Sequence, residues 1–476
     1  MAGDFFQKSN FYVRILEATY ESHPNRYPAR PGDVAARAGA AFEPGGLPVS
    51  QQAPQQEELA TGTAARTVRV WPIMLSMFVL NVCAYAAISG ALQILLPTQA
   101  RLIAGDGAPS ALALVTGIAA IASFAVPPFI GIRSDRTRSR WGRRAPWIFF
   151  GGLGTAGSLI MLGTSATVAG LVVGWFLMQA LVNIGLNVIL AVIPDRIPPH
   201  RHGLASTIQG LGLPIGGVVG VQIGAYFADA IATGYLVLAI LVPLASLVGA
   251  WLTREPREAA AEVRESRPVL AELRQTLSSL RFRDYRWVFI SRAVLFLGFT
   301  MVSSFSLYVL QDYVTLPPGM TAAEAAAIGS TLVLPLTVVS TAIAGPLVDR
   351  FGHHRMFVLG SGLVAAVSTL VPFVWPVWTA WLICGSVTAF SMGLYLGVDL
   401  ALATLVMPAA GDTGRDLGVF HIAVTAPQVV APFLAAMIVS SLGGYPALYV
   451  VSGVISLVGA LAVLRVRAPR TGHVSN

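Results

Sequence analysis

The sequence is poor in charge. Only 11% of its 476 residues are charged, against roughly 25% in soluble domains, while 55% are hydrophobic and the mean hydropathy is +0.69. A water-soluble enzyme of this length is therefore not expected. Disorder is excluded for most of the chain, because disordered segments combine low hydrophobicity with high charge. The composition predicts a polytopic membrane protein.

Lysine and cysteine are also scarce. Lys8 is the only lysine among 31 basic residues, and this preference for arginine predicts a GC-rich bacterial genome. Cys83 and Cys384 both lie in apolar runs, where cysteine behaves as a small hydrophobe, so no disulfide framework and no metal site are expected. The chain lacks a phosphate-binding loop and a His-Glu-x-x-His pattern, which excludes a P-loop ATPase and gives no sign of a cofactor.

Three segments differ from the apolar remainder. Residues 1–68 hold a stretch rich in Pro, Gly, Ala and Gln and begin without a signal-peptide pattern, which predicts a mostly disordered cytoplasmic tail. Residues 253–285 carry seven arginines and six acids, with leucines at helical spacing. This cytoplasmic linker is consistent with an amphipathic helix on the membrane surface and equally with a solvated linker helix. Residues 466–476 form a short cytoplasmic C-terminal tail.

Between these segments the chain alternates long apolar stretches with short polar breaks. A membrane-spanning helix needs about 20 apolar residues, and twelve stretches qualify. They divide into a bundle over 69–252 and a second bundle over 286–465. The twelve predicted spans are 71–96, 111–131, 146–165, 168–193, 204–228, 231–252, 286–311, 322–346, 355–375, 377–407, 417–441 and 445–464.

Basic residues are distributed unevenly over the breaks. When alternate breaks are assigned to alternate sides, 29 of the 31 basic residues fall on one side. Arg101 lies alone on the other side, and Arg292 falls within the seventh span. Because cytoplasmic loops are enriched in Lys and Arg, we predict a bacterial cell-membrane protein with both termini in the cytoplasm. The same asymmetry explains the pI near 9.8 without a nucleic-acid partner.

The two predicted bundles repeat each other. The pairs Asp135-Arg136 and Asp349-Arg350 each follow the second span of a bundle, at an offset of 214 residues. Pro194 with Arg201 and Pro408 with Arg415 repeat at the same offset after the fourth span. Two landmarks at one offset predict two six-helix halves in the same orientation, and such repeats are typical of secondary transporters.

The break after the second span carries the most specific motif, Gly131-Ile-Arg-Ser-Asp135-Arg136-Thr-Arg-Ser-Arg140-Trp-Gly142-Arg143-Arg144-Ala-Pro146. It resembles the Gly-x-x-x-Asp-Arg-x-Gly-Arg-Arg signature of the major facilitator superfamily. The tetrapeptide inserted into this signature and the Arg-Trp-Gly-Arg-Arg run are similar to the sucrose-permease and glycoside–cation symporter branch. The segment from Val398 to Gly418 resembles actinobacterial members of that branch. The resemblance implies an all-α membrane protein whose two pseudo-symmetric six-helix bundles enclose a cavity for a sugar or glycoside.

Carboxylates and arginines at the membrane edge suggest a cytoplasmic gate. A lone carboxylate is costly there and favours a partner, and Arg can pair bidentately with it or bind exposed carbonyls at a helix end. The alternative is that the arginines only set topology and bind anionic lipids. The predicted gate residues are Asp135, Arg136, Arg143, Arg144, Asp349 and Arg350.

Four polar rows inside the spans suggest the cavity. Each row has a spacing of four residues and therefore lies along one helix face, and the rows occupy the first and fourth spans of both halves. Hydrogen bonding between helices is the alternative. The predicted cavity residues are Asn81, Tyr85, Gln179, Asn183, Asn187, Ser304, Tyr308, Tyr395 and Asp399, on rows that also contain Ser89, Gln93, Thr300 and Ser391.

Asp399 and Arg292 are the two ionisable groups well inside the spans. An ionised aspartate near mid-bilayer costs about 2.5–3.5 kcal/mol on insertion scales, so Asp399 is the predicted proton-coupling residue. A permanent bond to a neighbouring helix and direct contact with substrate are the alternatives. The predicted function is secondary active transport by alternating access, as proton-coupled symport of a sugar or glycoside, with proton-coupled efflux of a drug or metabolite as the alternative. A monomer is expected, whose partners are substrate, protons and membrane lipids. No acid–base or metal constellation supports an enzyme.

Overall fold

The structure is a computed structural model that describes residues 70–135, 137, 139–198, 201–253, 278–406 and 413–466. The predicted N-terminal tail, residues 254–277 of the linker, Arg136 and residues 467–476 lie outside the described residues. Within them the chain is helical apart from its connections, and one isolated backbone bridge joins Thr315 to Val377. The all-α class predicted from the sequence is confirmed.

Eleven helical stretches of the described chain are long and apolar enough to cross a membrane, and the first of them makes two crossings. This stretch, Val70–Ser123, has 54 residues, and a straight helix of that length would measure about 81 Å against a hydrocarbon core of about 30 Å. Gly105, at a positive φ of 53°, ends its first arm, and the second arm packs back against the first. The described chain therefore makes twelve crossings.

The N-terminal half holds the first six crossings. The first is continuous but changes its winding through a π-helical turn at Ala91–Leu95, where one extra residue per turn shifts the register of the helix faces. The helices of this half are α4 (Val70–Gly90) with α5 (Leu96–Ala104), α6 (Ala108–Asp135), α7 (Ala145–Thr164), α8 (Val168–Arg196), α9 (His202–Tyr226) and α10 (Ile231–Leu252).

The C-terminal half holds the other six. Its first and third crossings are each built of two helices, broken at Phe305 and Thr369. The helices are α12 (Arg283–Ser304) with α13 (Ser306–Asp312), α14 (Ala322–Phe351), α15 (His354–Ser368) with α16 (Leu370–Val374), α17 (Trp378–Val406), α18 (Thr413–Ser441) and α19 (Gly444–Ala462).

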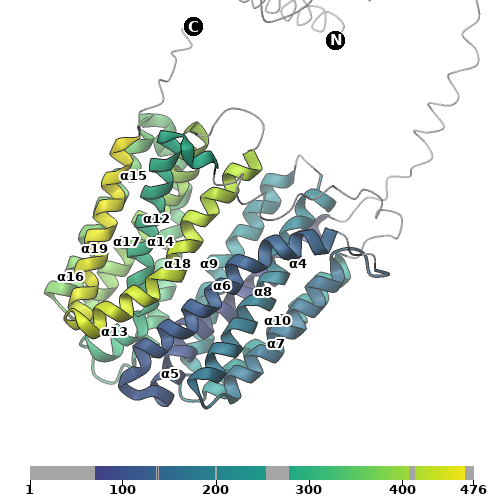
Figure 1. Ribbon diagram of the computed structural model, residues 1–476, viewed down its shortest axis with the longest axis horizontal. Coiled ribbons are helices and arrows are strands. Elements are labelled where there is room, and N and C mark those ends of the chain that lie inside the picture. The colour runs from purple at the N-terminus through teal and green to yellow at the C-terminus, as the bar shows by residue number, and fades with distance from the viewer. Residues whose placement is uncertain are drawn as a thin grey trace, which may run out of the picture. The chain divides into compact units, whose positions relative to one another are not determined.

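The two halves use the same helix pairings. The first crossing packs on the fifth in each half (α4 on α9, α12 on α18), the second on the fourth (α6 on α8, α14 on α17) and the third on the sixth (α7 on α10, α15 on α19). Between the halves, α6 packs on α18 and α9 packs on α14. These two pairs exchange with each other when the halves are exchanged, which is the pseudo-symmetry that the 214-residue offset predicts. Figure 1 shows α6 and α18 side by side where the two sets of helices meet.

Large apolar side chains on the outside of the helices fit a lipid environment. On α10, Leu236, Ile240, Leu244, Leu247 and Trp251 are all exposed at helical spacing. A stripe of this kind would be costly in water, whereas lipid tails are as apolar as leucine. The side chains on the outer surface and the twelve crossings both indicate a multi-pass membrane protein.

Candidate functional site

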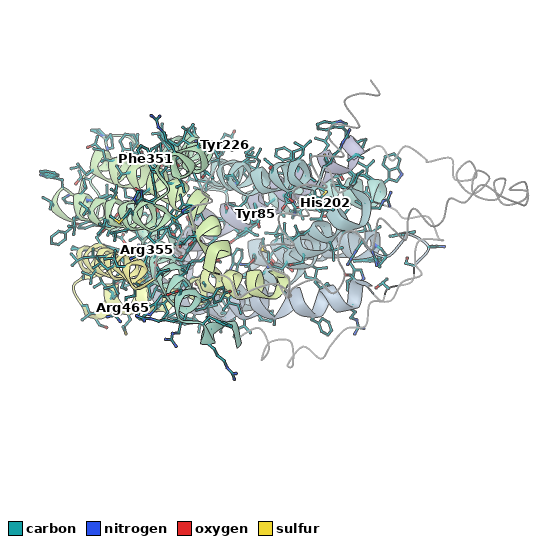
Figure 2. All side chains as sticks on the ribbon, turned by 90° about the horizontal axis from the view of Figure 1, so that it is seen from above. Tyr85, His202, Tyr226, Phe351, Arg355 and Arg465 are labelled. Carbon is teal, nitrogen blue, oxygen red and sulfur yellow. The ribbon has the colours of Figure 1, made fainter. Side chains whose placement is uncertain are left out.

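A cavity of about 670 Å³ lies between the two halves. From the N-terminal half it is lined by Tyr85, Ser89 and Gln93 of the first crossing and by residues of α9 between Leu213 and Val221. The C-terminal half contributes most of the wall, from α12, α13, α14, α15, α17, α18 and α19. Seen from above, Tyr85 lies where the helices of the two halves meet (Figure 2).

The cavity wall carries no charged side chain among its described lining residues. Hydroxyl and amide groups from both halves project from an otherwise apolar and aromatic surface. Such a wall suits a neutral ligand that offers hydroxyl groups and an apolar face, because small-molecule sites combine apolar walls with a few polar groups that fix orientation. The polar lining residues include Tyr85, Ser89, Gln93, Ser330, Thr337, Thr388, Tyr395 and Gln428.

Of the predicted cavity residues, Tyr85 and Tyr395 line the cavity and the others do not. The row on α8 satisfies its own helix: the side-chain amides of Asn183 and Asn187 donate to the carbonyls of Gln179 and Asn183, at 2.7 and 2.8 Å. Helix α9, whose glycines lie among apolar residues, lines the cavity where the sequence pattern predicts α8. Sequence periodicity does not reveal this exchange, since half-buried amides bonded to their own backbone resemble ligand-binding amides.

The first crossing also places its row differently. Asn81 is buried, donates to the carbonyl of Met77 at 2.8 Å and lies against Gly212 of α9. On α12 the hydroxyl of Ser304 donates to the carbonyl of Thr300 at 2.7 Å. Both side chains are thus satisfied within their own helix, which is the ordinary behaviour of Ser and Asn in a helix without a better partner.

A buried ion pair lies behind the cavity wall. Arg292 of α12 pairs with the Oδ2 atom of Asp399 on α17, and the Tyr395 hydroxyl donates to Oδ1 of the same carboxylate at 2.8 Å. The Asp399 side chain is 3% exposed and that of Arg292 is 15% exposed. The guanidinium also lies 5.8 Å from the ring centre of Phe296, which meets the Tyr395 ring edge to face at 6.2 Å. Both carboxylate oxygens therefore have a donor.

Asp399 lies off the middle of its helix, whereas the sequence predicts a depth near mid-bilayer. Helix α17 runs from Trp378 to Val406, so Asp399 is about 32 Å along the helix from Trp378 and about 10 Å from its other end. The predicted span 377–407 was nearly right in its bounds, but it is longer than a membrane core and its centre is a poor guide to depth. The carboxylate lies toward the end of the bundle that carries the connection between α6 and α7.

That end, called the arginine-rich end, holds the predicted gate residues. Arg144 is buried and donates to the Ser134 hydroxyl at 2.6 Å, and the indole of Trp147 donates to the Thr137 hydroxyl at 2.8 Å, so the motif fastens α6 to the start of α7. Gly142 has a φ of 93°, a conformation that favours glycine, which accounts for the Gly of the Arg-Trp-Gly-Arg-Arg run.

The remaining gate residues are placed on their helices. Asp135 is the last residue of α6 and Asp349 lies in the last turn of α14, while Arg350 is exposed with its guanidinium 5.9 Å from the Phe351 ring centre. Arg143 is half-buried. Gly352, which follows α14, has a φ of 66°. Like Gly142 in the first half, it therefore adopts a positive φ. The gating role of all these residues stays a prediction.

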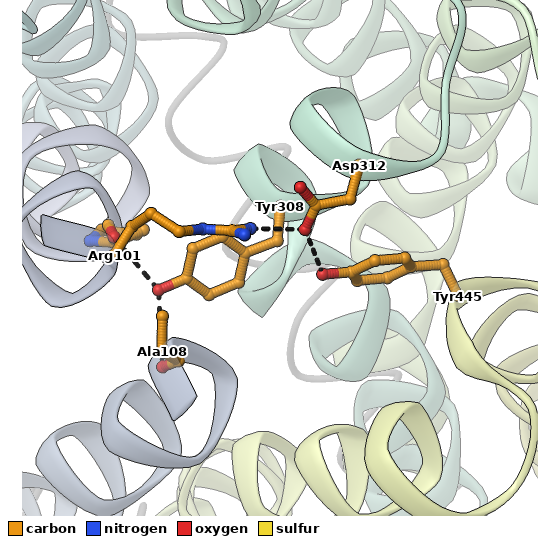
Figure 3. A network of polar contacts seen from close by, with 6 residues as sticks. Arg101, Ala108, Tyr308, Asp312 and Tyr445 are labelled. Carbon is orange, nitrogen blue, oxygen red and sulfur yellow. Dashed lines mark hydrogen bonds and ion pairs between the residues drawn. The ribbon is translucent and has the colours of Figure 1, made fainter. Parts of the chain in front are cut away.

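At the opposite end a polar network joins the two halves (Figure 3). Arg101 of α5 pairs with Asp312 of α13, and the Tyr445 hydroxyl of α19 donates to the same carboxylate at 2.8 Å. The Tyr308 hydroxyl donates to the carbonyl of Pro97 at 3.1 Å, and the Arg101 guanidinium lies 4.9 Å over the Tyr308 ring. We call this set the opposite-end latch.

Sequence reasoning missed the latch. The polar row on its helix predicts a cavity position for Tyr308, and the distribution of basic residues leaves Arg101 alone on its side. The pattern does not link Arg101 to Asp312, which follows it by 211 residues, although an acid and an arginine at the same membrane edge are natural partners. Nearby, the Tyr313 hydroxyl donates to the carbonyl of Pro372 at 3.0 Å, and partial burial raises the pKa of Tyr313, which keeps this donor protonated.

Other contacts between the halves also lie toward this end. The Gln222 amide of α9 donates to the Thr331 hydroxyl of α14 at 2.7 Å and to the carbonyl of Ala327 at 3.0 Å. Phe433 of α18 lies against Gly117 of α6. Each of these residues is closer along its helix to the opposite end than to the arginine-rich end. The halves are therefore joined at the end remote from the arginine cluster.

Comparison with known families decides what this architecture is. The family model of the Major Facilitator Superfamily matches residues 74–336 and 288–476, together most of the chain. The chain belongs to the major facilitator superfamily. As a member of this superfamily it is a multi-pass transporter of a small molecule and not an enzyme.

The sequence match to an individual relative covers a smaller part of the chain. The sucrose transport protein SUC3 of Arabidopsis thaliana is 26% identical over a segment that covers 22% of this chain and 21% of that protein. The chain thus matches about a fifth of the length of this curated relative.

Solved structures of several transporters match over most of the chain. The POT family transporter PepTSo matches with a TM-score of 0.64 at 13% identity, over 82% of this chain and 97% of that one. The nucleoside transporter NupG matches with a TM-score of 0.65 at 13% identity, over 82% and 99%. A bacterial homologue of the human lysosomal transporter Spinster, inward-facing and unoccupied, matches with a TM-score of 0.57 at 15% identity, over 84% and 95%. Likeness at this identity establishes the shared fold.

Proposed function

We propose that this superfamily member takes up a sugar or glycoside together with a proton by alternating access. The observation that carries the proposal is a buried carboxylate, Asp399, held directly behind a cavity whose described wall is uncharged and rich in hydroxyl groups. The motif between Asp135 and Arg144 and the partial match to a sucrose transport protein support the same substrate class.

The cavity chemistry favours a neutral substrate. A peptide or another zwitterion would bring charges into a wall that offers no charged partner, and burying an unpaired charge is costly. A sugar brings hydroxyl groups for Gln93, Thr388 and Gln428 and an apolar ring face for aromatic side chains such as Trp381. A glycoside with an apolar aglycone fits such a wall equally well.

The proton site follows from the burial of Asp399. Its carboxylate is nearly inaccessible and lies on the same helix as the cavity residue Tyr395. Arg292 compensates the charge while Asp399 is ionised, and a proton compensates it otherwise. A carboxylate with two alternative partners can bind a proton on one side of the membrane and release it on the other.

The position of the latch bears on which side the cavity faces. Because the halves are joined at the opposite end, we infer that this is the state that opens toward the arginine-rich end, and the arginine asymmetry supports assigning that end to the cytoplasm. In the alternate state the arginine-rich end closes, and we assign Asp135, Arg136, Arg143, Arg144, Asp349 and Arg350 to the gate that forms there.

Proton-coupled efflux of a drug or metabolite is the second candidate. The observation that favours it is the apolar share of the wall, with Phe296, Phe299, Val302, Leu334 and Trp381 among its residues. An apolar cation or neutral drug would use these contacts, whereas a sugar would use the hydroxyl groups.

The deciding experiment is transport into proteoliposomes under an imposed pH difference. The purified full chain is tested with radiolabelled sucrose, maltose and salicin, and in parallel for the extrusion of ethidium and Hoechst 33342. Accumulation of a sugar driven by inward proton flow, abolished by a protonophore, supports symport. Dye extrusion in the direction opposite to proton flow, without uptake of any sugar, rejects symport in favour of efflux.

A further inference from the structure

Two aromatic rings separate the cavity from the buried ion pair. Phe296 and Tyr395 line the cavity, while Arg292 and Asp399 are not among its lining residues. The two rings meet edge to face at 6.2 Å, and the Arg292 guanidinium lies 5.8 Å from the centre of the Phe296 ring. A molecule bound in the cavity therefore meets this aromatic layer before it meets the carboxylate.

The hydroxyl of Tyr395 is the polar connection through this layer. It donates to the Oδ1 atom of Asp399 at 2.8 Å, while Oδ2 takes the ion pair with Arg292. A phenol has one proton to donate and lone pairs that accept. While Asp399 is ionised, the carboxylate takes that single proton, and the Tyr395 hydroxyl has none left to donate to another acceptor.

We propose that Tyr395 is a positioning residue that makes substrate affinity depend on the protonation of Asp399. When Asp399 binds a proton from solution, its neutral carboxyl group accepts hydrogen bonds weakly, and the Tyr395 hydroxyl turns to donate to an oxygen of the substrate. The substrate then binds the protonated carrier more tightly, and by reciprocity a bound substrate favours proton binding. The inference rests on the proposed proton-coupled transport.

The groups that face Asp399 make Tyr395 the natural reporter of its state. From α12 the carboxylate faces Arg292, and from its own helix it faces Tyr395. From α14, Ala344 packs against Gly397. From α15, Arg355 donates to the carbonyl of Leu464 at 2.8 Å, which directs its charge toward the turn that follows α19. Of these groups, Tyr395 is the one that also lines the cavity.

The first test measures ligand affinity at two pH values. Trp381 lines the cavity, so quenching of protein fluorescence by 4-nitrophenyl β-D-glucoside reports occupancy, with Trp381→Phe to identify the signal. The native chain is expected to bind about tenfold more tightly at about pH 5 than at about pH 8, a ratio within the usual range of coupling between sites. In Tyr395→Phe, which keeps the ring against Phe296, the ratio falls to about one because the switching proton is gone.

Tyr85→Phe is the matched control. Tyr85 also lines the cavity, on the other half of the molecule, and lies far along the sequence from the ion pair. Its loss weakens binding at both pH values and leaves the ratio unchanged. A pH ratio that survives in Tyr395→Phe overturns the inference.

A second measurement needs no substrate. The infrared C=O stretch of the protonated carboxyl group, identified by its loss in Asp399→Asn, is followed against pH in the empty protein. Tyr395→Phe moves the pH at which this band appears, and Tyr85→Phe leaves it in place. If the glucoside does not bind the native chain but the band moves, the substrate class is wrong and the link from Tyr395 to Asp399 stands. A band that is unchanged in Tyr395→Phe rejects the link.

Discussion

Asp399 carries the proposed coupling as a single side chain. Replacing it by Asn keeps the shape but removes both the proton-binding group and the charge that pairs with Arg292. We expect Asp399→Asn to exchange labelled substrate across the membrane at near-native rates and to lose accumulation driven by a pH difference. Counterflow and gradient-driven uptake in the same proteoliposomes measure the two activities. A variant that still concentrates substrate against its gradient would show that another group carries the proton.

Arg292 matters for stability as well as for transport. Removing one partner of a buried ion pair leaves an uncompensated charge and typically costs about 3–5 kcal/mol. Arg292→Gln should therefore lower the free energy of unfolding by about that amount at neutral pH. The loss should shrink at acid pH, because protonation of Asp399 removes the unpaired charge.

The double variant Arg292→Gln with Asp399→Asn is the control for this prediction. It carries neither charge of this pair and should recover most of the lost stability. Thermal unfolding in detergent across a pH series measures all three proteins. Equal destabilisation in the single and double variants would show that packing, rather than charge, dominates at this position.

At the scale of elements, α9 packs on α4 through a row of glycines. A Cβ atom on Gly216 would lie 2.5 Å from the carbonyl oxygen of Val82, and one on Gly220 would lie 2.1 Å from that of Ala86. Both helices supply cavity wall, so this contact sets the shape of the N-terminal side. Such close approach is the purpose of small residues in membrane helices.

Gly220→Ala is expected to force α9 away from α4 and to destabilise the protein by about 1–3 kcal/mol, as overpacking usually does. Gly210→Ala, one of the glycines of the same helix where an added Cβ meets nothing within 4 Å, should be neutral or slightly stabilising. The two variants are compared by thermal unfolding and by ligand affinity. Equal stability of the two variants would refute the close-packing interpretation.

The sequence predicted the helices well and their faces less well. All twelve predicted spans correspond to crossings, because a run of about 20 apolar residues has few other uses. The π-helical turn at Ala91–Leu95 and the breaks at Phe305 and Thr369 leave no periodic signal. Which face a helix turns toward the cavity depends on its neighbours, so the sequence pattern of α8 predicts cavity residues from its amides. For the same reason the pattern does not predict the contact between Arg101 and Asp312.

For the whole molecule, the opposite-end latch should bias the equilibrium between the two states. Arg101 and Asp312 are each about one-third exposed, and pairs of this kind contribute about 0.2–1 kcal/mol. Asp312→Asn should therefore raise the population open at the opposite end by up to about fivefold. The readout is labelling of Ser89→Cys by an impermeant maleimide applied to that side, in a background with Cys83→Ser and Cys384→Ser.

Asp229→Asn is the control for the latch. It removes an exposed carboxylate from the connection between α9 and α10 at the same end without touching the latch. The pair with reversed charges, Arg101→Asp with Asp312→Arg, should restore low labelling. Labelling that rises equally in Asp229→Asn would trace the effect to surface charge in general.

The orientation of the whole chain is a separate prediction. Reporter fusions after Gly107 and after Glu262 should report opposite sides of the membrane, with Glu262 in the cytoplasm, because cytoplasmic loops carry the arginines. An alkaline phosphatase and a green fluorescent protein fusion at each site measure the two sides independently. The same side for both positions would contradict twelve crossings.

The pairing of Arg292 with Asp399 has a consequence for the energy source of the cycle. With Asp399 ionised the pair is electrically neutral, and with Asp399 protonated the site carries one positive charge. In the proposed cycle the empty carrier therefore returns without moving net charge, whereas the loaded carrier moves one charge through part of the membrane field. An interior-negative voltage thus accelerates the loaded step alone, by at most about 2.3 kcal/mol per 100 mV. Uptake would then be electrogenic and would continue on voltage when the pH difference has vanished.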